Sequence, residues 1–438
     1  MRRVGIVTLG CKVNQYDSDA LASEFRRAGY EVVPFGEAAD VYVVNTCTVT
    51  QIGDKKSRQL LRRAHSKNPD AIVVATGCYA QSSPDELAAL PGVGVVSGTA
   101  NRAGIVRAVD EAFQRRDVPP AVLVSDIDSC FDFEDLATEG SAERTRAYIK
   151  IEDGCENFCS YCRVPYVRGP VRSRRLESIT GEAERLAARG FREVILTGID
   201  LGAYGRDMGG QPDLSDVMEA VAPVPGIARV RLSSVDPTDV TERLLTVMGS
   251  AQAVCPHLHV PLQSGHDGVL ARMNRHYTVA QYEEVVNRAR AAIPNLAVTT
   301  DVIVGFPGED ESAFAATMET CERVAFSRMH VFQYSRRKGT VAADLPGQVG
   351  NDEKARRSEK LISLGRRLSL KFHEALVGMR MSVLVEQADG GSFEGLTPSY
   401  VRVVGKGRFE PGQIVSVVVS DAHEGFVGGE AEEETIRT

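Results

Sequence analysis

The sequence lacks three features that would place it in a membrane or make it a general nucleic-acid binder. Its 438 residues contain no apolar run of about 18 residues or more, which a membrane-spanning helix requires. The N-terminal residues lead directly into a strand-like segment, without the apolar stretch and cleavage site of a signal peptide. The formal net charge of −8 excludes a uniformly basic surface, although local basic patches can still bind phosphate. We therefore expect a cytoplasmic protein with no membrane partner.

The nine cysteines do not fit a disulfide framework. A reducing cytoplasm keeps thiols unpaired, and an odd number of cysteines cannot all pair with one another. Cysteines that follow a pattern are therefore better explained as ligands of metal ions or iron–sulfur clusters. The chain otherwise resembles a globular protein, with 43% apolar and 25% charged residues, and its length favours two or three domains.

Hydrophobic periodicity changes along the chain and predicts an α/β protein of three domains. Residues 1–125 alternate apolar runs with amphipathic helices, which indicates a parallel-sheet α/β domain, and residues 126–144 form an acidic linker. Residues 145–377 repeat strand and helix six times, as in a partial (β/α)6 barrel. Short β runs between glycine-rich turns indicate a small β-barrel over 378–430. Residues 431–438 form an acidic tail that we expect to be disordered.

The individual strands are predicted from apolar runs bounded by turn residues. In the N-terminal domain these runs are Gly5–Leu9, Val41–Asn45 and Ala71–Ala75. In the partial barrel they are Ala147–Glu152, Glu193–Thr197, Arg229–Ser233, His257–Leu262, Ala297–Val304 and Met329–Tyr334. In the C-terminal domain they are Val383–Val385, Ser399–Val404 and Ile414–Ser420. A long charged helix is expected over Glu353–Ala375.

A cysteine triplet with C-x3-C-x2-C spacing is the strongest chemical signal in the sequence. Cys155, Cys159 and Cys162 follow the first strand of the partial barrel, at the end where such folds carry their active loops. Three thiolates in one loop can hold three irons of a [4Fe–4S] cluster, and the missing fourth cysteine leaves one iron open. A zinc site is the alternative, but zinc sites usually add a second Cys or His pair, and none follows here. We therefore interpret the triplet as the ligands of a catalytic cluster.

Three further cysteines share one context, although they are far apart in the sequence. Cys11, Cys47 and Cys78 each follow an apolar strand of the N-terminal domain. Because the carboxyl ends of parallel strands share one edge of a sheet, we expect the three thiols to converge there and hold a second cluster. The alternative is burial of cysteine as a small apolar side chain. We apply that alternative to the cysteines without such a context, Cys130, Cys255 and Cys321.

The cysteine triplet and the strand before it resemble the radical S-adenosylmethionine superfamily. Segments Arg231–Ser234 and Asp301–Glu309, at later strand ends, are also similar to that superfamily. The resemblance implies that S-adenosylmethionine chelates the open iron and is cleaved reductively to a 5′-deoxyadenosyl radical. At the second strand end the superfamily's Gly-Gly-Glu is replaced by Gly198-Ile199-Asp200, which leaves the contact to the methionine amino group open. The residues implied to bind S-adenosylmethionine are Tyr161, Gly198, Arg231 and Ser233.

Two cysteine trios and a C-terminal β-barrel resemble the methylthiotransferase family over nearly the whole chain. The matching motifs are Thr8–Tyr16, Asn45–Thr50 and Gly154–Pro170, and Thr397–Val403 is similar to the TRAM RNA-binding barrel. The residues Leu-Gly-Cys-Lys-Val-Asn-Gln-Tyr at 9–16 most resemble the MtaB type, which acts on N6-threonylcarbamoyladenosine at position 37 of tRNA. The resemblance implies two [4Fe–4S] clusters and two molecules of S-adenosylmethionine. One molecule methylates sulfur at the N-terminal cluster, and the other supplies the radical that activates carbon 2 of the adenine.

The resemblance also implies partners, namely the anticodon loop of a tRNA and a reductant such as flavodoxin or ferredoxin. A base in a single-stranded loop is accessible to such an enzyme. Candidate RNA contacts are the basic residues Lys55, Arg58, Arg62, Arg168, Arg172, Arg174, Arg175, Arg336, Arg337 and Lys338. The arginines after Gly169, or residues 336–338, are the candidates for binding the threonyl carboxylate. The alternatives are a methylthiotransferase acting on isopentenyladenosine or on a ribosomal-protein aspartate, and an RNA-binding protein whose clusters are only structural.

Overall fold

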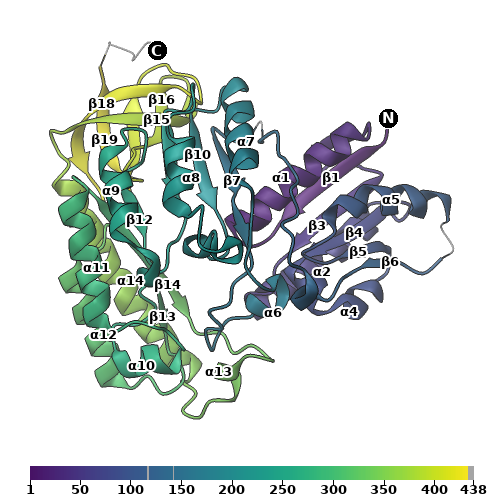
Figure 1. Cartoon of the computed structure of the whole chain (residues 1–438), viewed down its shortest axis with the longest axis horizontal. Helices are drawn as coiled ribbons and strands as arrows, with labels where there is room; N and C mark the ends of the chain where they lie inside the picture. The colour runs from purple at the N-terminus through teal and green to yellow at the C-terminus, as the bar shows by residue number, and fades with distance from the viewer. Residues whose placement is uncertain (116–117, 142, 433–438) are drawn as a thin grey trace.

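The computed structural model describes residues 1–115, 118–141 and 143–432, and it confirms the predicted α/β fold class with a small C-terminal barrel (Figure 1). Among these residues, no helix combines the length and apolarity needed to cross a membrane. Most of the predicted acidic tail, residues 433–438, lies outside the described residues.

The N-terminal domain is a parallel sheet of six strands in the order β2-β1-β3-β4-β5-β6. The predicted runs form β1 (Arg3–Thr8), β3 (Val41–Thr46) and β4 (Ile72–Gly77). Three shorter strands, which the apolar pattern does not predict, extend the sheet: β2 (Glu31–Pro34), β5 (Val93–Ser97) and β6 (Ala121–Leu123). One face is covered by α1 (Lys12–Arg27) and α5 (Ile105–Gln114), and the other by α2 (Gln51–Lys67), α3 (Cys78–Ser82) and α4 (Pro84–Ala88).

The central domain is an open barrel of six parallel strands, arranged as two three-stranded sheets. The sheets have the orders β11-β10-β7 and β12-β13-β14, and isolated bridges from Val230 to Val254 and from Ser234 to His259 join them. The strands are β7 (Arg146–Lys150), β10 (Glu193–Thr197), β11 (Arg229–Leu232), β12 (His257–His259), β13 (Ala297–Val304) and β14 (Arg328–Gln333). Six strands do not close the ring, so β7 and β14 border an opening.

The helices of the central domain lie outside these strands and bury its largest apolar core. They are α7 (Leu176–Ala188), α8 (Leu214–Val221), α9 (Glu242–Ser250), α11 (Val279–Ala292), α12 (Glu311–Val324) and α14 (Asn351–Glu374). Helix α14 is the long charged helix that the sequence predicted over Glu353–Ala375. Short elements shape the loops at the strand ends: β8 (Glu152–Asp153), α6 (Pro165–Arg168), β9 (Arg172–Ser173), α10 (Asp267–Arg272) and α13 (Val341–Asp344). Strand β12 is shorter than predicted, because Pro261 has no N–H to continue the ladder.

The C-terminal domain is a closed barrel in the order β15-β16-β17-β19-β18. Its strands are β15 (Arg380–Asp389), β16 (Ser392–Leu396), β17 (Arg402–Lys406), β18 (Ile414–Ala422) and β19 (Val427–Ala431). The predicted strand over Ser399–Val404 begins only at Arg402, because Tyr400 has a positive φ of 66° and its N–H closes a turn onto Thr397. The expectation that the acidic tail begins at 431 is also wrong by one residue, since Ala431 pairs with Val417 in the barrel.

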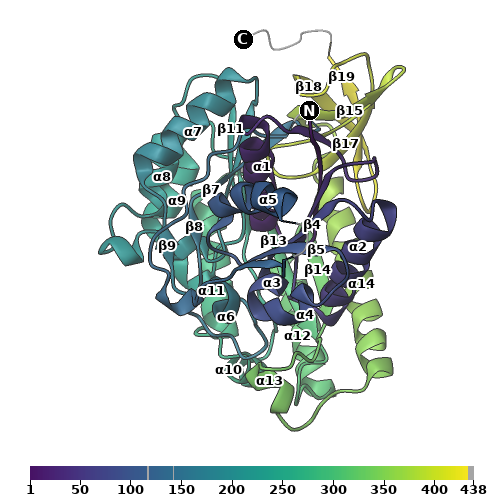
Figure 2. The ribbon, with the colours of Figure 1, turned by 90° about the vertical axis from the view of Figure 1, so that its right-hand side faces the viewer.

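The N-terminal domain lies across the opening of the central barrel (Figure 2). On the β7 side, Asp17 of α1 meets Lys150 at 2.6 Å and Arg168 at 3.1 Å, and Arg168 also meets Asp153 at 2.9 Å. Burial alone would raise the pKa of Asp153, but Arg168 and Lys150 hold it well below its usual range. On the β14 side, Arg337 meets Asp54 of α2 at 2.8 Å. The domain therefore bridges both borders of the opening.

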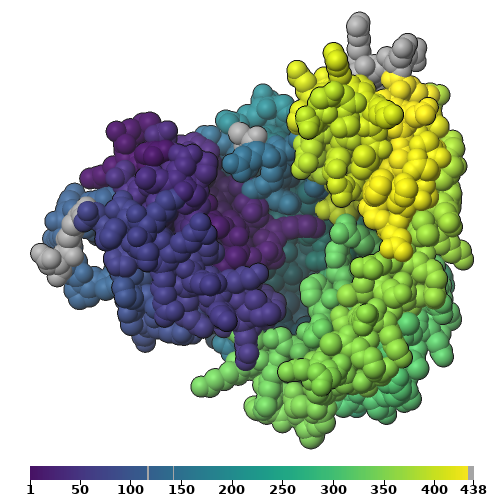
Figure 3. Space-filling model, turned by 180° about the vertical axis from the view of Figure 1, so that it is seen from behind, coloured from purple at the N-terminus to yellow at the C-terminus, as the bar shows by residue number. Residues whose placement is uncertain are grey.

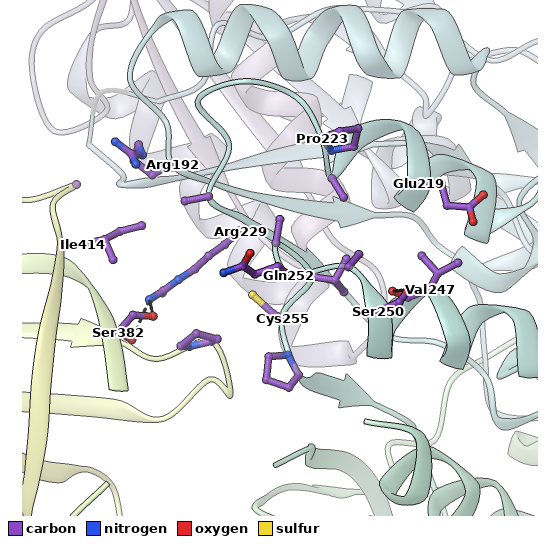
Figure 4. Close-up of a pocket in the computed structure, with 18 of the residues that line it drawn as sticks. Arg192, Glu219, Pro223, Arg229, Val247, Ser250, Gln252, Cys255, Ser382 and Ile414 are labelled. Carbon is purple, nitrogen blue, oxygen red and sulfur yellow. Dashed lines mark hydrogen bonds between the residues drawn. The ribbon is translucent and has the colours of Figure 1, made fainter. Parts of the chain in front are cut away.

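The C-terminal barrel is joined to the amino-terminal ends of the central strands. Arg229 donates to the Ser382 carbonyl at 2.9 Å and to its hydroxyl at 3.0 Å, beside a cavity of about 1210 Å³ (Figure 4). Cys255 lines this cavity, where burial raises the pKa of its thiol to about 11. This joint lies at the end of the barrel opposite to the loop that carries the cysteine triplet.

Candidate functional site

The cysteine triplet lies in a loop that leaves the central barrel after β8. Gly154 turns the chain with a φ of +104°, and a Cβ there would lie 1.9 Å from the Pro170 carbonyl oxygen, so only glycine fits. The Cys155 N–H donates to the Gly169 carbonyl at 3.0 Å, and the Ser160 N–H donates to the Met273 carbonyl at 2.9 Å. The loop is thus held from two sides, and its three thiols remain partly exposed.

The three cysteines of the N-terminal domain come together at the carboxyl edge of its sheet. The Asn14 amide oxygen lies 3.9 Å from the Cys11 sulfur and 4.0 Å from the Cys78 sulfur. A Cβ on Gly10 would lie 3.1 Å from the Cys47 sulfur, so the backbone before Cys11 passes directly beside it. Parallel strand ends therefore place these distant cysteines in one group, as their context predicted.

The buried side chain of Arg168 connects the segment after the triplet with the other cysteine trio. The Arg168 guanidinium, from the helix after the triplet, donates to the Cys78 sulfur at 3.4 Å and to the Asn14 amide oxygen at 2.6 Å. Burial raises the pKa of the Cys162 thiol to about 12, and the charges of Cys159 and Cys78 add to the shift. The helix that follows the triplet therefore contacts the first cysteine trio directly, through Arg168.

The chemistry of the six thiols fits iron–sulfur clusters. Burial raises the pKa of Cys47 to about 12, with a further contribution from Cys78, and burial also raises the pKa of Cys155. A bound metal supplies the positive charge that stabilises such thiolates. Within the described residues, no three Cys, His, Asp or Glu side chains gather tightly enough to hold one metal ion. A four-iron cluster is larger than one ion, so its thiolates stand further apart.

The residues predicted to contact S-adenosylmethionine divide into two groups. Tyr161 packs against Phe306 beside the triplet, and a Cβ on Gly198 would lie 2.5 Å from a Glu152 carboxylate oxygen. The Ser233 hydroxyl is buried and has no hydrogen-bond partner within the described residues, so it is available to a bound molecule. Arg231 instead donates to Glu193 at 2.8 Å and to the Pro398 carbonyl at 2.7 Å, and therefore holds the C-terminal barrel.

Two further residues lie near the triplet. The sequence analysis did not identify Arg275, and it noted Asp200 only as a difference from the superfamily's Gly-Gly-Glu motif. Arg275 donates to the Cys159 sulfur at 3.2 Å and pairs with Asp236. Asp200, which stands where the superfamily motif has glutamate, lies 3.7 Å from the Cys155 sulfur and accepts from the Asn157 amide at 2.8 Å. Arg275 lies 113 positions after Cys162 in the sequence, so no local spacing connects it with the triplet.

Four of the arginines proposed to bind RNA or the threonyl carboxylate are internal structural residues. Arg168, Arg172 and Arg174 are each at most 3% exposed, and Arg337 is buried and paired with Asp54. Arg168 pairs with Asp17 and Asp153, and Arg174 pairs with a buried glutamate, Glu182. Their sequence positions after the triplet suggested solvent contact, but in the folded protein these side chains are buried against other protein groups. The candidates that remain exposed are Lys55, Arg62, Arg175, Arg336 and Lys338.

Family models match two parts of the chain. The model described as "Uncharacterized protein family UPF0004" matches residues 3–98, which hold the first cysteine trio. The Radical SAM superfamily model matches residues 149–321, which begin at the triplet's strand. Among solved structures, the radical S-adenosylmethionine methyltransferase TsrM from Kitasatospora setae is similar in fold, with a TM-score of 0.57 and 16% identity over 89% of this chain and 81% of that chain.

Curated relatives match almost the entire length. The threonylcarbamoyladenosine tRNA methylthiotransferase MtaB of Bacillus subtilis is 41% identical over 96% of this chain and 94% of its own. The Aquifex aeolicus MtaB is 39% identical over 95% of this chain and 100% of its own. A tRNA-2-methylthio-N(6)-dimethylallyladenosine synthase from Moorella thermoacetica is 36% identical over 97% of both chains. With these similarities over nearly its whole length, the chain belongs to the methylthiotransferase family of radical S-adenosylmethionine enzymes.

Proposed function

We propose that this protein is a tRNA methylthiotransferase that converts N6-threonylcarbamoyladenosine at position 37 to its 2-methylthio derivative. The observation that carries the proposal is the presence of two cysteine trios linked by Arg168, in a chain 41% and 39% identical to two MtaB relatives over nearly its whole length. The carboxyl ends of two parallel sheets supply the trios, and a methylthio transfer needs a sulfur source and a radical source close together.

The cofactors we propose are two [4Fe–4S] clusters and S-adenosylmethionine. Cys155, Cys159 and Cys162 would hold one cluster, and Cys11, Cys47 and Cys78 the other, with three thiolates each. When bound, the clusters supply the electron that cleaves S-adenosylmethionine and the site at which sulfur is methylated.

Neighbouring residues position the cysteines of both trios. Arg168 and Asn14 both contact the sulfur of Cys78, and Arg275 donates to the sulfur of Cys159. Gly154 and the backbone of Ser160 fix the triplet's loop to the barrel. Preorganised donors of this kind keep their geometry during the reaction, which favours catalysis.

The partners we propose are a tRNA anticodon loop and a cytoplasmic one-electron reductant such as flavodoxin or ferredoxin. The exposed cations include Lys55 and Arg62 on α2, and Arg336 and Lys338 after β14, and the Arg337–Asp54 ion pair joins these two segments. Such cations bind phosphate without sequence preference, so tRNA affinity should fall with added salt.

The test is a reaction of the reconstituted, reduced protein with S-adenosylmethionine and tRNA that carries N6-threonylcarbamoyladenosine. We expect 2-methylthio-N6-threonylcarbamoyladenosine in the nucleoside digest, measured by mass spectrometry. Methylthiolation of isopentenyladenosine tRNA instead, or of a ribosomal-protein aspartate, would replace the proposed substrate. Failure to cleave S-adenosylmethionine reductively would favour an RNA-binding protein with structural clusters.

A further inference from the structure

Phe332 is a large apolar side chain that the fold leaves in contact with solvent. It lies on β14, the strand that borders the opening of the central barrel, and it is 52% exposed. Its strand neighbours Met329 and Val331 pack against the apolar core beneath the outer helices. Because side chains alternate between the two faces of a strand, Phe332 and His330 lie on the opposite face, which is the inner face of the open barrel.

The inner face around Phe332 combines an aromatic ring with hydrogen-bonding groups. The register of the parallel strands sets Ile303 beside Phe332 and Asp301 beside His330. The Asp301 carboxylate lies 3.3 Å from the His259 ring, and the rings of His259 and His330 have centroids 6.0 Å apart. A nucleobase has an apolar face that stacks and a polar edge that forms hydrogen bonds. This face of the barrel therefore has the chemistry that suits a nucleobase.

Ile303 connects this inner face with the cysteine triplet. Ile303 and Tyr161 both pack against the apolar cluster that contains Phe306, and the ring centroids of Tyr161 and Phe306 are 6.4 Å apart. Tyr161 directly precedes Cys162 in the triplet's loop. One layer of apolar side chains therefore extends from the triplet's loop to the pair of strands that carries Phe332.

The segment after β14 contacts both of the segments that carry the cysteine trios. Arg163, the residue after the triplet, donates to the Gly339 carbonyl at 3.1 Å, and Gln51 of α2 donates to the Arg336 carbonyl at 3.1 Å. Figure 3 shows a hollow between the purple N-terminal domain and the green part of the chain, to which β14 belongs. Strand β14 therefore ends where both of these segments meet it.

Exposed cations accompany the ring. Arg328 lies on β14, and Arg336 and Lys338 follow that strand. Proteins bind single-stranded nucleic acid with this combination, because cations contact the phosphates while an aromatic ring stacks on a base. S-adenosylmethionine also contains an adenine, but Gly198 and Ser233, which resemble its binding residues, follow β10 and β11 of the other three-stranded sheet. The ring on the border strand therefore suits a base of the RNA.

We propose that the ring of Phe332 stacks on the adenine of the target adenosine and positions its carbon 2 for the radical step. An adenine that is extruded from an RNA loop loses its stacking neighbours, and the ring replaces one of them. This inference rests on the proposed function, because it requires an adenosine of RNA as the substrate. It does not depend on which group the N6 atom of that adenosine carries.

The first test measures stacking directly, with anticodon stem-loops that carry the fluorescent base 2-aminopurine at position 37 or at the next nucleotide. Stacking on an aromatic ring quenches this fluorophore. For position 37, the complex with Phe332→Leu, which keeps an apolar side chain without a ring, should be about twofold or more brighter than the wild-type complex. Phe332→Tyr should restore the quenching. Equal brightness in the wild-type and Phe332→Leu complexes, or a difference only at the next nucleotide, would overturn the proposal.

The second test separates a contact with RNA from a contact with S-adenosylmethionine. In the reconstituted, reduced protein, Phe332→Leu should lower kcat/KM for methylthiolation of the tRNA about tenfold or more, because a stacking contact with the base is lost. Cleavage of S-adenosylmethionine to 5′-deoxyadenosine without RNA should be unchanged. Loss of that cleavage would assign the ring to S-adenosylmethionine and overturn the proposal. Val122→Ala, in a 48% exposed residue of the edge strand β6, is the matched control and should leave both reactions unchanged.

Failure of this inference differs from failure of the proposed function. A wild-type protein that methylthiolates no adenosine would refute the proposed function, while the fluorescence of the stem-loop complexes would still decide whether Phe332 stacks on the base. A wild-type protein that methylthiolates its tRNA, with Phe332→Leu equally active, would overturn only the role of Phe332.

Discussion

The two cysteine trios reach the same arrangement by opposite routes. Cys155, Cys159 and Cys162 lie within eight consecutive residues of one loop, whereas Cys11, Cys47 and Cys78 follow three separate strands. The first trio depends on local loop geometry, and the second depends on the register of a parallel sheet. The comparison shows that one kind of site can be encoded by spacing alone or by topology alone, and that the two kinds should fail differently when they are mutated.

The largest expected difference follows from removing one thiol of each trio. Cys155→Ala and Cys47→Ala should each abolish methylthiolation and halve the iron content, measured by iron and sulfide analysis with Mössbauer spectra. Only Cys155→Ala should also abolish 5′-deoxyadenosine formation, because the triplet is proposed to hold the cluster that cleaves S-adenosylmethionine. Cys321→Ala, in a buried cysteine of α12, is the control and should keep both clusters. A wild-type protein with only one cluster would refute the two-site model.

The next effect concerns the charge network between the two trios. Arg168→Met leaves Asp17 and Asp153 buried without their shared guanidinium, so we expect a loss of about 3–5 kcal/mol in the free energy of unfolding. Chemical denaturation measures this loss. Arg402→Met removes an exposed ion pair with Glu394 and should cost less than about 1 kcal/mol. Similar losses in both variants would show that the buried network does not join the domains.

A smaller loss of stability is expected when a glycine beside either cysteine trio is replaced, one in the triplet's loop and one at a strand end of the N-terminal sheet. Gly154 and Gly77 both have positive φ values, +104° and +94°, and a Cβ would lie 1.9 Å from the Pro170 carbonyl oxygen or 2.4 Å from the Asn45 amide oxygen. Gly154→Ala and Gly77→Ala should each cost about 1–3 kcal/mol and reduce the occupancy of the adjacent cluster only. Gly36→Ala, where a Cβ meets no atom within 4 Å, is the control. Loss of both clusters from either variant would contradict independent sites.

The smallest expected effect is a decrease in the free energy of unfolding as the pH is lowered. Burial tends to raise the pKa of Asp17, but Arg102, Lys150 and Arg168 hold it below its ordinary value, and the same holds for Asp153. Carboxyls with a lowered pKa in the folded state stabilise the protein above about pH 4, and this stability is lost as the pH falls toward the folded pKa. Unfolding free energies measured between about pH 6 and pH 3 should therefore decrease by about 1–2 kcal/mol. Arg168→Met should flatten that dependence, and an unchanged slope would contradict the assignment.

Much of the architecture could be predicted because the apolar runs are long and regular. Glu193–Thr197 and Ala297–Val304 became strands with the predicted ends, since each is an apolar run between turn residues. The short strands β2, β16 and β19 could not be predicted, because a few residues with mixed polarity become strands only through their neighbours. Arg168 and Arg174 were misread for a similar reason, since a sequence does not show whether an arginine faces water or a buried carboxylate.

The sequence by itself determined the triplet loop, the strand-end context of the other three cysteines and the order of the three domains. Spacing and periodicity are local properties, and they persist in any fold that the chain adopts. Only the tertiary structure decided that the N-terminal domain covers the barrel opening and that Arg168 links the two cysteine trios. Those features depend on contacts of Arg168 with Cys78 and Asp17, which lie 90 and 151 positions away, and such pairing arises only when the domains pack together.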